Sequence, residues 1–550
     1  MNEQITQDKK MGKILFNIIK KYKIYLLIIV VFVILNTYFS TYPSSIIGKI
    51  TDLLYDINQT KTEIMNNVFY LVGIAVLLLL LRLPWRSLCA FLSRYLEKDL
   101  KNKIFEQFLK IKLQNLQEIK NGELMAYITK DVTEIRVFFY RIISYGTRII
   151  MTTIIGMYVM ITGVSLKLTL AIIPPVLITV YLIIKIRKYV EKSFKKAQKY
   201  FTDLSEFVQE STDAIRTTKA YCGERNRLKE FIKKNKLLKQ SNNVVDVHST
   251  LLSICINICV GLCFGITLIY GSNLVLTGEI TVGDLVTFNG YISLIIWPLS
   301  WLPGIIARYK RAQISCERLN KFFCLEREKI YIDNKKTMDS LKGDIKINDL
   351  SFNYASTIEV ALEHINLEIK QGQTLGIMGT IGSGKTTLMN LLLKLYPVNN
   401  GKIFIGGRDI NDIPVIELRK NICYITQDNF LFSTTLRDNI SLFREDYDDD
   451  EIIESTKSAL INDDIQEMKN GIHTIIGERG VDLSGGQKQR VVISRAFLQK
   501  SNIVIFDDTF SALDNRTEEK LLKNVRELTK DKTCIIISNR ISDIKDADNI

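Results

Sequence analysis

The first 310 residues of the chain alternate between long apolar stretches and long polar stretches. A helix that crosses the hydrocarbon core of a bilayer needs about 20 mostly apolar residues. Stretches of this length predict six membrane-spanning helices, at residues 24–44, 68–88, 142–163, 168–186, 251–274 and 285–306. The polar stretches near 89–140 and 187–248 are expected to form helices that extend beyond the bilayer, because a helix rises about 1.5 Å per residue. The pattern predicts an all-α, six-helix membrane domain with two long loops outside the membrane.

The pattern changes near residue 344, after which short β-rich runs alternate with helical stretches. This alternation is typical of an α/β domain built on a central sheet. We therefore divide the chain into a membrane domain at 1–324, a linker at 325–343 and an α/β domain at 344–550.

Basic residues exceed acidic ones, and the net charge is +14. The Lys and Arg residues gather beside the apolar stretches, for example at 9–10 and 185–199. The positive-inside rule then predicts a multi-pass protein of the cell membrane whose N-terminus, two long loops and α/β domain face the cytosol. A nucleic-acid partner is not expected, because the sequence contains no recognisable nucleic-acid-reading module.

Several polar residues lie in or beside the predicted spans. Such groups are costly at membrane depth and often line a substrate pathway, whereas those near span ends extend their charged tips to the interface. The sequence leaves both readings open for Asn36, Arg82, Arg86, Arg141, Arg148, Asn257 and Asn289.

A glycine-rich segment follows the apolar run 374–378. It matches the phosphate-loop pattern G-x-x-x-x-G-K-[ST] and consists of Gly379, Thr380, Ile381, Gly382, Ser383, Gly384, Lys385 and Thr386. The glycines let backbone N–H groups surround phosphate oxygens, Lys385 places a charge beside the β- and γ-phosphates, and the Thr386 hydroxyl suits Mg²⁺. Thr387 lies at the start of the next helix, whose N-terminus favours an anion. The segment predicts an α/β P-loop nucleotide-binding domain.

A second apolar run, Ile503–Asp507, predicts a buried strand that ends in a carboxylate. In phosphate-loop enzymes a carboxylate at this point holds Mg²⁺, directly or through water. An ordinary core strand is the alternative, but it does not explain why the carboxylate falls at this point in the series of motifs.

Between these motifs lies Leu483–Gln487, the pentapeptide Leu-Ser-Gly-Gly-Gln. The phosphate loop, this pentapeptide and the strand ending in Asp, in that order, resemble the ATP-binding cassette (ABC) ATPases. With six spans ahead of the cassette, the whole chain resembles a half-transporter of the multidrug-like ABC exporters with the type IV fold. The resemblance implies that two cassettes enclose two ATP molecules, so that a signature segment contacts the ATP of the other chain. The residues concerned are Ser484, Gly485, Gly486 and Gln487.

The resemblance assigns roles to further residues. Tyr354 would stack on adenine, and Gln427 would contact Mg²⁺ and assist catalysis. ATP and Mg²⁺ are the implied cofactors, with Thr386, Gln427 and Asp507 around the metal. A small molecule, a lipid or a peptide would be the cargo. Related cassettes usually continue past the position of Ile550, so we expect this cassette to be truncated at its C-terminus.

Two positions depart from the family pattern. Asp508 stands where the family usually has Glu as the general base, and Asn539 stands where it has His near the γ-phosphate. Asp is one methylene shorter than Glu, and Asn cannot carry the charge or proton of His. Both changes affect the same end of one site, which predicts a site that binds ATP and hydrolyses it weakly. This resembles the degenerate subunit of heterodimeric ABC exporters.

Four readings therefore remain. The first is an exporter half that works with a paralogous chain. The others are a homodimeric exporter with slow hydrolysis, an importer of metal-chelating compounds with the same fold, and a membrane regulatory ATPase that transports nothing.

Overall fold

The computed structural model describes residues 9–55, 61–117, 119, 121–299, 301–328, 341–354, 360–380, 382–477, 480 and 482–550. The chain divides into two compact units, which are treated separately below. The first comprises residues 1–107 and 121–324, and the second comprises residues 108–120 and 325–550. Most of the predicted linker at 325–343 lies outside the described residues.

The first unit is helical. Its elements are α2 (Lys9–Lys21), α3 (Lys23–Phe39), α4 (Tyr42–Tyr55), α5 (Lys61–Lys110), α7 (Asn121–Ala126), η1 (Tyr127–Asp131), α8 (Val132–Arg141), η2 (Ile142–Gly146), α9 (Thr147–Gly163), α10 (Leu166–Asp213), α11 (Ile215–Ala220), α12 (Glu224–Leu276), α13 (Val282–Leu299) and α14 (Leu302–Cys324). Both η1 and η2 are single π-helical turns. Helix α5 continues three residues past the boundary of this unit.

Four described segments are long and apolar enough to cross a membrane, namely Lys23–Leu54, Lys61–Lys110, Gly122–Gly163 and Asn257–Leu276. Each contains or overlaps one of the predicted spans. The predicted span at 168–186 overlaps a shorter apolar helix, Leu166–Ile178, and the span at 285–306 is divided between α13 and α14. The number of six spans therefore stays a prediction.

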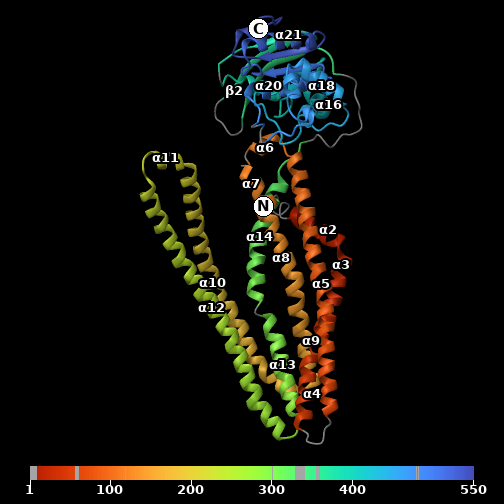
Figure 1. Cartoon of the computed structure of the whole chain (residues 1–550), viewed down its shortest axis with the longest axis vertical. Coiled ribbons are helices and arrows are strands. Elements are labelled where there is room, and N and C mark those ends of the chain that lie inside the picture. The colour runs from red at the N-terminus through yellow and green to blue at the C-terminus, as the bar shows by residue number, and fades with distance from the viewer. Residues whose placement is uncertain are drawn as a thin grey trace. The chain divides into compact units, whose positions relative to one another are not determined.

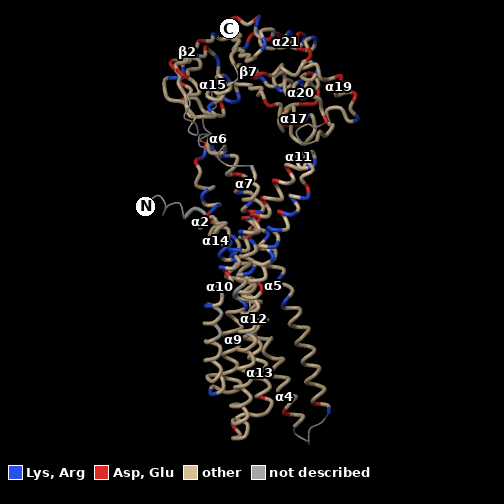
Figure 2. Tube along the Cα trace, turned by 90° about the vertical axis from the view of Figure 1, so that its left-hand side faces the viewer, with Lys and Arg blue, Asp and Glu red and all other residues tan. Residues whose placement is uncertain are grey.

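Helices α10 and α12 pack along their length and lead to the short helix α11 at their tip (Figure 1). Pro174 and Pro175 lie inside α10 without ending it, as membrane bundles tolerate. Figure 2 shows that the helices around α4, α9 and α13 are nearly free of charge, whereas Lys, Arg, Asp and Glu gather along the extensions toward α11. This distribution fits the predicted polar loops outside the membrane.

Helices α4 and α13 cross at unusually close range. A Cβ atom on Gly48 would collide with the Thr287 side chain and the Gly283 backbone, and one on Gly290 would collide with Ser44. At the same crossing, Asp52 of α4 accepts hydrogen bonds from the Gly283 N–H (2.6 Å) and the Thr281 hydroxyl. Small residues let membrane helices approach in this way, because close packing replaces the hydrophobic driving force that lipid cannot supply.

The second unit contains two sheets. One has the order β2-β1-β4-β5 with antiparallel neighbours, and the other has the order β3-β8-β7-β6 with parallel neighbours. The strands are β1 (Ile345–Asn353), β2 (Val360–Ile369), β3 (Thr374–Ile377), β4 (Ile403–Ile405), β5 (Arg408–Asp409), β6 (Ile422–Ile425), β7 (Ile503–Asp507) and β8 (Thr533–Ile537). The helices are α6 (Leu113–Gln117), α15 (Lys385–Leu392), η4 (Ile410–Asp412), α16 (Val415–Asn421), α17 (Leu436–Ser441), α18 (Asp449–Ser458), α19 (Asn462–Gln466), η5 (Gly471–His473), α20 (Gly485–Leu498), α21 (Asn515–Thr529) and α22 (Ile541–Ile544).

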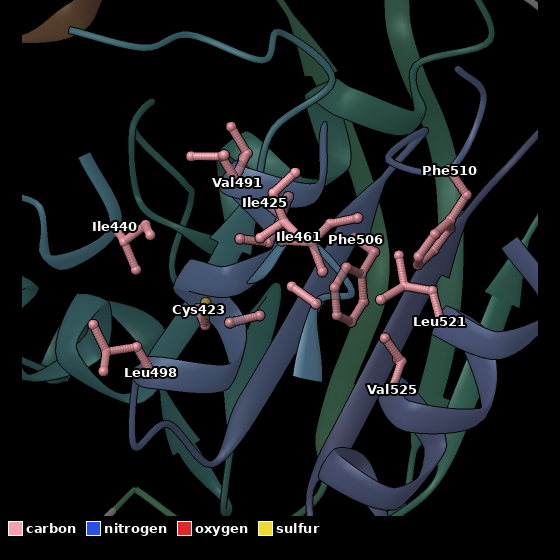
Figure 3. Packing of buried hydrophobic residues seen from close by; sticks show 14 of the residues in the cluster. Cys423, Ile425, Ile440, Ile461, Val491, Leu498, Phe506, Phe510, Leu521 and Val525 are labelled. Carbon is pink, nitrogen blue, oxygen red and sulfur yellow. The ribbon is translucent and has the colours of Figure 1, made fainter. Parts of the chain in front are cut away.

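Strand β7 lies at the centre of this unit, and all five of its residues are buried. Phe506 faces a core that includes Val491 of α20 and Leu521 of α21, as Figure 3 shows. Ile505 belongs to the other core, on the opposite face of the parallel sheet. Because a parallel sheet is covered on both faces, its strands read as continuous apolar runs, which is the pattern that the sequence shows.

Residues 108–120 join the second unit although they lie within the first half of the chain. Ile111 pairs with Arg327, and the Glu328 N–H donates to the Lys110 carbonyl (2.7 Å). Leu113 packs against the core around β3, and Lys112 forms an ion pair with Glu326 (2.5 Å). The sequence did not predict this excursion, which places α6 outside the membrane domain assigned to residues 1–324.

Candidate functional site

The glycine loop connects β3 to α15, the strand–loop–helix order that the motif requires. Gly382 and Gly384 have φ angles of +85° and +89°, in the left-handed region that favours glycine. A Cβ atom on Gly384 would lie 2.5 Å from the Ala361 carbonyl oxygen. The loop therefore needs glycine at 384 for both its backbone conformation and its close packing. Ile381 lies outside the described residues.

The Lys385 ammonium is folded over this loop. Its Nζ donates to the carbonyl oxygens of Gly379 (2.7 Å) and Thr380 (2.9 Å). The charge thus lies across the loop where backbone N–H groups are expected to meet phosphate oxygens. Thr387 lies in the first turn of α15, and its hydroxyl forms a hydrogen bond with the hydroxyl of Tyr354 (2.9 Å).

Asp507 is held at the end of β7 beside the first turn of α15. Its Oδ2 accepts hydrogen bonds from the Thr386 hydroxyl (2.9 Å) and the Tyr424 hydroxyl (2.9 Å). Asp507 is only 2% exposed. Burial, followed by the nearby Asp507 charge, raises the pKa of Tyr424, so this phenol stays a donor. A hydroxyl and a carboxylate at hydrogen-bonding distance form the hard oxygen set that Mg²⁺ prefers, so these residues fit the implied metal.

Asp508 follows directly and takes a left-handed backbone conformation, with φ of +47°. Its N–H donates to the Ile537 carbonyl (2.9 Å), which ties the turn to β8. Gln427 Nε2 donates to Asp508 Oδ2 (3.3 Å). The structure therefore brings together the predicted base and the predicted loop glutamine. Asn539 is exposed on the turn after β8.

Tyr354 is half-buried rather than a surface residue. Its ring packs edge-on against Tyr396 and Phe352, with centroids 5.1 Å away in each case. The ring is thus fixed next to the helix that opens at Lys385. Its stacking on adenine stays a prediction.

The pentapeptide forms the N-terminus of α20. Ser484 caps the helix by accepting from the Gln487 N–H (3.3 Å), while the Gln487 side chain accepts from the Ser484 N–H (3.0 Å). Gln487 Nε2 also donates to Asp464 (2.7 Å), and a Cβ atom on Gly486 would be in ordinary van der Waals contact with Ala512 and Leu513. None of these contacts involves the glycine loop of the same chain.

Sequence reasoning missed three residues that position the site. Tyr424 lies on β6, which runs parallel to β7, and it pairs with Ile505, two residues before Asp507. A sequence-based pairing of these two strands would have placed Tyr424 near the site. Gln489 Oε1 accepts from the Ala512 N–H (3.0 Å) and so links α20 to the turn after Asp508. Arg540 donates to the Ser511 carbonyl (2.9 Å) and to Glu518 (2.7 Å), so the residue after Asn539 anchors the same turn.

Arg495 ties α20 to the segment that follows Gln427. Its Nε donates to the Asn439 carbonyl (2.9 Å) and its Nη2 donates to the Phe430 carbonyl (3.1 Å). Burial lowers the pKa of Arg495 to about 10, which leaves it charged at neutral pH. Glu478 and Arg479, which resemble part of an exporter-specific loop, lie outside the described residues.

The comparisons with known proteins agree with this arrangement. The description "ABC transporter transmembrane region" matches residues 26–299, and "ABC transporter" matches residues 362–511. YheI of Bacillus subtilis, a "probable multidrug resistance ABC transporter ATP-binding/permease protein", is 34% identical over 462 residues, which cover 83% of this chain and 78% of YheI. The chain belongs to the ABC transporter family.

Two further similarities cover nearly the whole ABC transporter chain. The "multidrug resistance-like ATP-binding protein MdlA" of Buchnera aphidicola subsp. Schizaphis graminum is 32% identical over 97% of this chain and 91% of its own length. A solved structure of a bacterial Atm1-family ABC exporter with ATP bound superposes with a TM-score of 0.79 at 22% identity, covering 96% of this chain and 92% of that one. The predicted fold class, a helical membrane domain followed by an ABC nucleotide-binding domain, is confirmed. The chain is a membrane protein of an ATP-hydrolysing transporter family.

Proposed function

We propose that this ABC transporter chain is one half of a heterodimeric exporter. In this proposal it binds ATP at a weakly hydrolysing site and lends its LSGGQ segment to the competent site of a paralogous partner. The observation that carries the proposal is that Asp508 and Asn539 both depart from the family pattern, while Lys385, Thr386 and Asp507 keep it.

The geometry around Asp508 supports weak hydrolysis. A general base must lie within hydrogen-bonding reach of the water that it activates. The Asp carboxylate is one methylene shorter than that of Glu, and its Oδ2 faces Gln427 at 3.3 Å. A displacement of about 1 Å of a catalytic group can reduce the rate on the order of 100-fold. Asn539 offers a hydrogen bond near the γ-phosphate but no positive charge.

ATP binding by the same site is supported by the residues that remain. The glycine loop has the conformation that Gly384 permits, and Lys385 supplies a positive charge. The Tyr354 ring is fixed by its packing against Tyr396. Thr386 and Asp507, with Gln427 nearby, would hold Mg²⁺, which neutralises phosphate charge when bound. The site therefore favours retention of the nucleotide over its cleavage.

The signature segment supports a role in the partner's site. Ser484 caps α20 with its oxygen as acceptor, so its hydroxyl proton remains available to a phosphate oxygen. The helix N-terminus adds a favourable dipole for that anion. The segment 484–487 contacts Asp464 and residues 512–513. None of these contacts involves the glycine loop of the same chain.

We further propose that the chain is a multi-pass protein of the cell membrane, with its ATP-binding domain in the cytosol. The basic residues that flank the apolar helices support this orientation. The helical unit would move a small-molecule, lipid or peptide cargo outward as the two cassettes close on ATP and open after hydrolysis.

The test compares ATP hydrolysis by the purified chain alone and by the chain mixed with a half-transporter that has Glu and His at the two altered positions. We expect the mixed pair to hydrolyse ATP at least about tenfold faster per dimer. Within that pair, Gly486→Asp in this chain should abolish most turnover, because the added carboxylate would repel the ATP that the partner binds opposite the LSGGQ segment. Lys385→Ala in this chain should cost much less, because it affects the weak site.

Equal turnover by the homodimer and the mixed pair would contradict the heterodimer and support a homodimeric exporter. A pair in which Lys385→Ala costs as much as Gly486→Asp would contradict the assignment of the weak site to this chain.

A further inference from the structure

The helical unit contains a small cavity with an unusual lining. The cavity has a volume of about 220 Å³. Its lining consists of three arginines and three aromatic residues, namely Arg82, Trp85, Arg86, Tyr145, Arg148 and Trp301. These come from α5, from η2, from α9 and from the turn between α13 and α14. Segments that are far apart in the sequence thus converge on one cationic and aromatic pocket.

The three guanidinium groups have no acidic partner among the described residues. Other arginines of the same unit do have one, since Arg136 pairs with Glu97 (3.1 Å) and Arg308 pairs with Glu134 (2.9 Å). The Arg148 guanidinium lies over the Trp301 ring, 5.6 Å from its centroid. A cluster of unpaired cations in a helix bundle is costly, and such groups usually face a pathway or a ligand.

The Trp85 side chain gives an independent indication of a ligand. Trp85 is only 2% exposed, yet its indole N–H has no acceptor in the described structure. A buried donor without a partner is destabilising, so natural structures rarely keep one without a reason. Trp85 also lines the pocket, so this donor without an acceptor belongs to the wall of the same cavity as the three guanidinium groups.

The backbone around Tyr145 is also unusual. Tyr145 lies in η2, a single π-helical turn between α8 and α9. Isolated π-turns are rare and are frequent at functional sites, because one extra residue changes the direction of a side chain. Here Tyr145 meets the Trp301 ring edge-on, with centroids 4.9 Å apart. The π-turn therefore helps to close the aromatic side of the pocket.

We propose that this pocket binds the acidic head group of an anionic amphiphile, with a phosphate monoester as the probe chemistry, and that such anions are a substrate class of the exporter. The inference rests on the proposed export function. Drug-sized ligands fill about 300–1,000 Å³, so a cavity of 220 Å³ holds a head group while the apolar body lies along the neighbouring helices. Arginine suits the acidic group, because its planar fork forms bidentate hydrogen bonds with phosphate or carboxylate.

The tryptophans of the chain provide an intrinsic fluorescence signal for a binding experiment. It contains three tryptophans, and Trp85 and Trp301 both line the pocket. The full-length Trp297→Phe variant, in neutral maltoside micelles without nucleotide, therefore reports on the pocket through its tryptophan fluorescence. Dodecyl phosphate, phenyl phosphate and dodecanol are titrated separately. We expect saturable quenching by dodecyl phosphate and none by dodecanol, which has the same chain without the charge.

Substitutions then assign the signal to the arginines. Arg148→Ala should weaken dodecyl phosphate binding about tenfold or more, since it removes a charge-assisted hydrogen bond from a shielded site. Arg148→Lys should restore part of that loss, which a purely structural role would not do. Arg94→Ala, a matched loss of one exposed arginine of α5 outside the lining, should leave the affinity unchanged. An unchanged thermal transition of each variant in the same micelles shows that the helical unit is folded, and ATP binding shows the same for the second unit.

The probes also distinguish the source of the anion. Tight binding of dodecyl phosphate with weak binding of phenyl phosphate supports a membrane amphiphile, and equal binding of both supports a soluble organic anion. Quenching by dodecanol equal to that by dodecyl phosphate, or affinity unaffected by Arg148→Ala, would overturn the proposal. The measurement needs neither ATP nor a partner chain, so its failure is separate from a failure of the heterodimer.

Discussion

At the residue scale, Asp508 is subject to two requirements, one set by the backbone turn and one set by the proposed chemistry. Its backbone is left-handed, a conformation that Asp and Asn adopt several-fold more often than most residues. Asp therefore suits the turn between β7 and the segment that Arg540 anchors. In the proposed function, the same side chain is one methylene too short for the role that Glu has in the family, because a general base must reach the water that it activates.

Asp508→Glu together with Asn539→His should raise the ATPase rate of the chain alone about tenfold or more. The longer carboxylate regains its reach, and the imidazole can carry a charge toward the γ-phosphate. Steady-state phosphate release at saturating ATP measures the change. Asp508→Asn with Asn539→His is the matched control, because it keeps the size and removes the base. A double variant no faster than this control would show that the two positions do not limit hydrolysis.

Lys385→Ala should reduce ATP affinity about tenfold or more while leaving the cassette folded. Among the described residues, the ammonium donates to the carbonyls of Gly379 and Thr380, neither of which is buried, so its removal leaves no buried group without a partner. Equilibrium binding of a fluorescent ATP analogue measures the loss. Lys523→Ala on α21 is the control, because Lys523 is exposed. Lys394→Ala is unsuitable, because Lys394 donates hydrogen bonds to three backbone carbonyls.

At the element scale, the sequence predicted the strands of the site closely and the helices only in outline. Ile503–Asp507 was predicted as a strand and is β7, because a fully buried parallel strand leaves an uninterrupted apolar run. The predicted span at 24–44 lies within the apolar segment Lys23–Leu54, but the sequence did not predict the break near Ser40, where α3 ends before α4 begins. The π-turns η1 and η2 left no signal either, since a single inserted residue does not change the apolar pattern.

The closeness of α4 and α13 is likewise invisible in a single sequence, because it depends on which glycines face each other. Gly48→Val should destabilise the helical unit by about 1–3 kcal/mol, the usual cost of inserting atoms into a packed site. The temperature at which monodisperse protein is lost from detergent solution should fall accordingly. Gly265→Val on α12 is the control, since a Cβ atom there meets nothing within 4 Å. An equal fall for both variants would contradict the close crossing.

At the scale of the whole molecule, the two units follow from composition, and the orientation across the membrane rests on charge alone. Cys222 provides a test of that orientation, because it is exposed just past α11 at the tip of the α10–α12 pair. We expect a membrane-impermeant maleimide to label it in inside-out vesicles and not in sealed right-side-out vesicles. Cys423 and Cys534 should stay unlabelled in both, because burial raises each thiol pKa to about 12. Cys222→Ser should remove most of the signal, because the other cysteines are buried or half-buried, and labelling of Cys222 from the outer side would contradict the predicted topology.

The excursion of residues 108–120 into the second unit has a consequence for inheritance and engineering. The nucleotide-binding unit is encoded in two separated pieces, because Ile111 and Leu113 complete its surface from within the first half of the gene. A recombination event at residue 324 would transfer a cassette without its own α6, leaving an apolar surface uncovered. Swaps between relatives should therefore succeed only where the donor carries both pieces, or where the recipient's α6 already fits the new cassette.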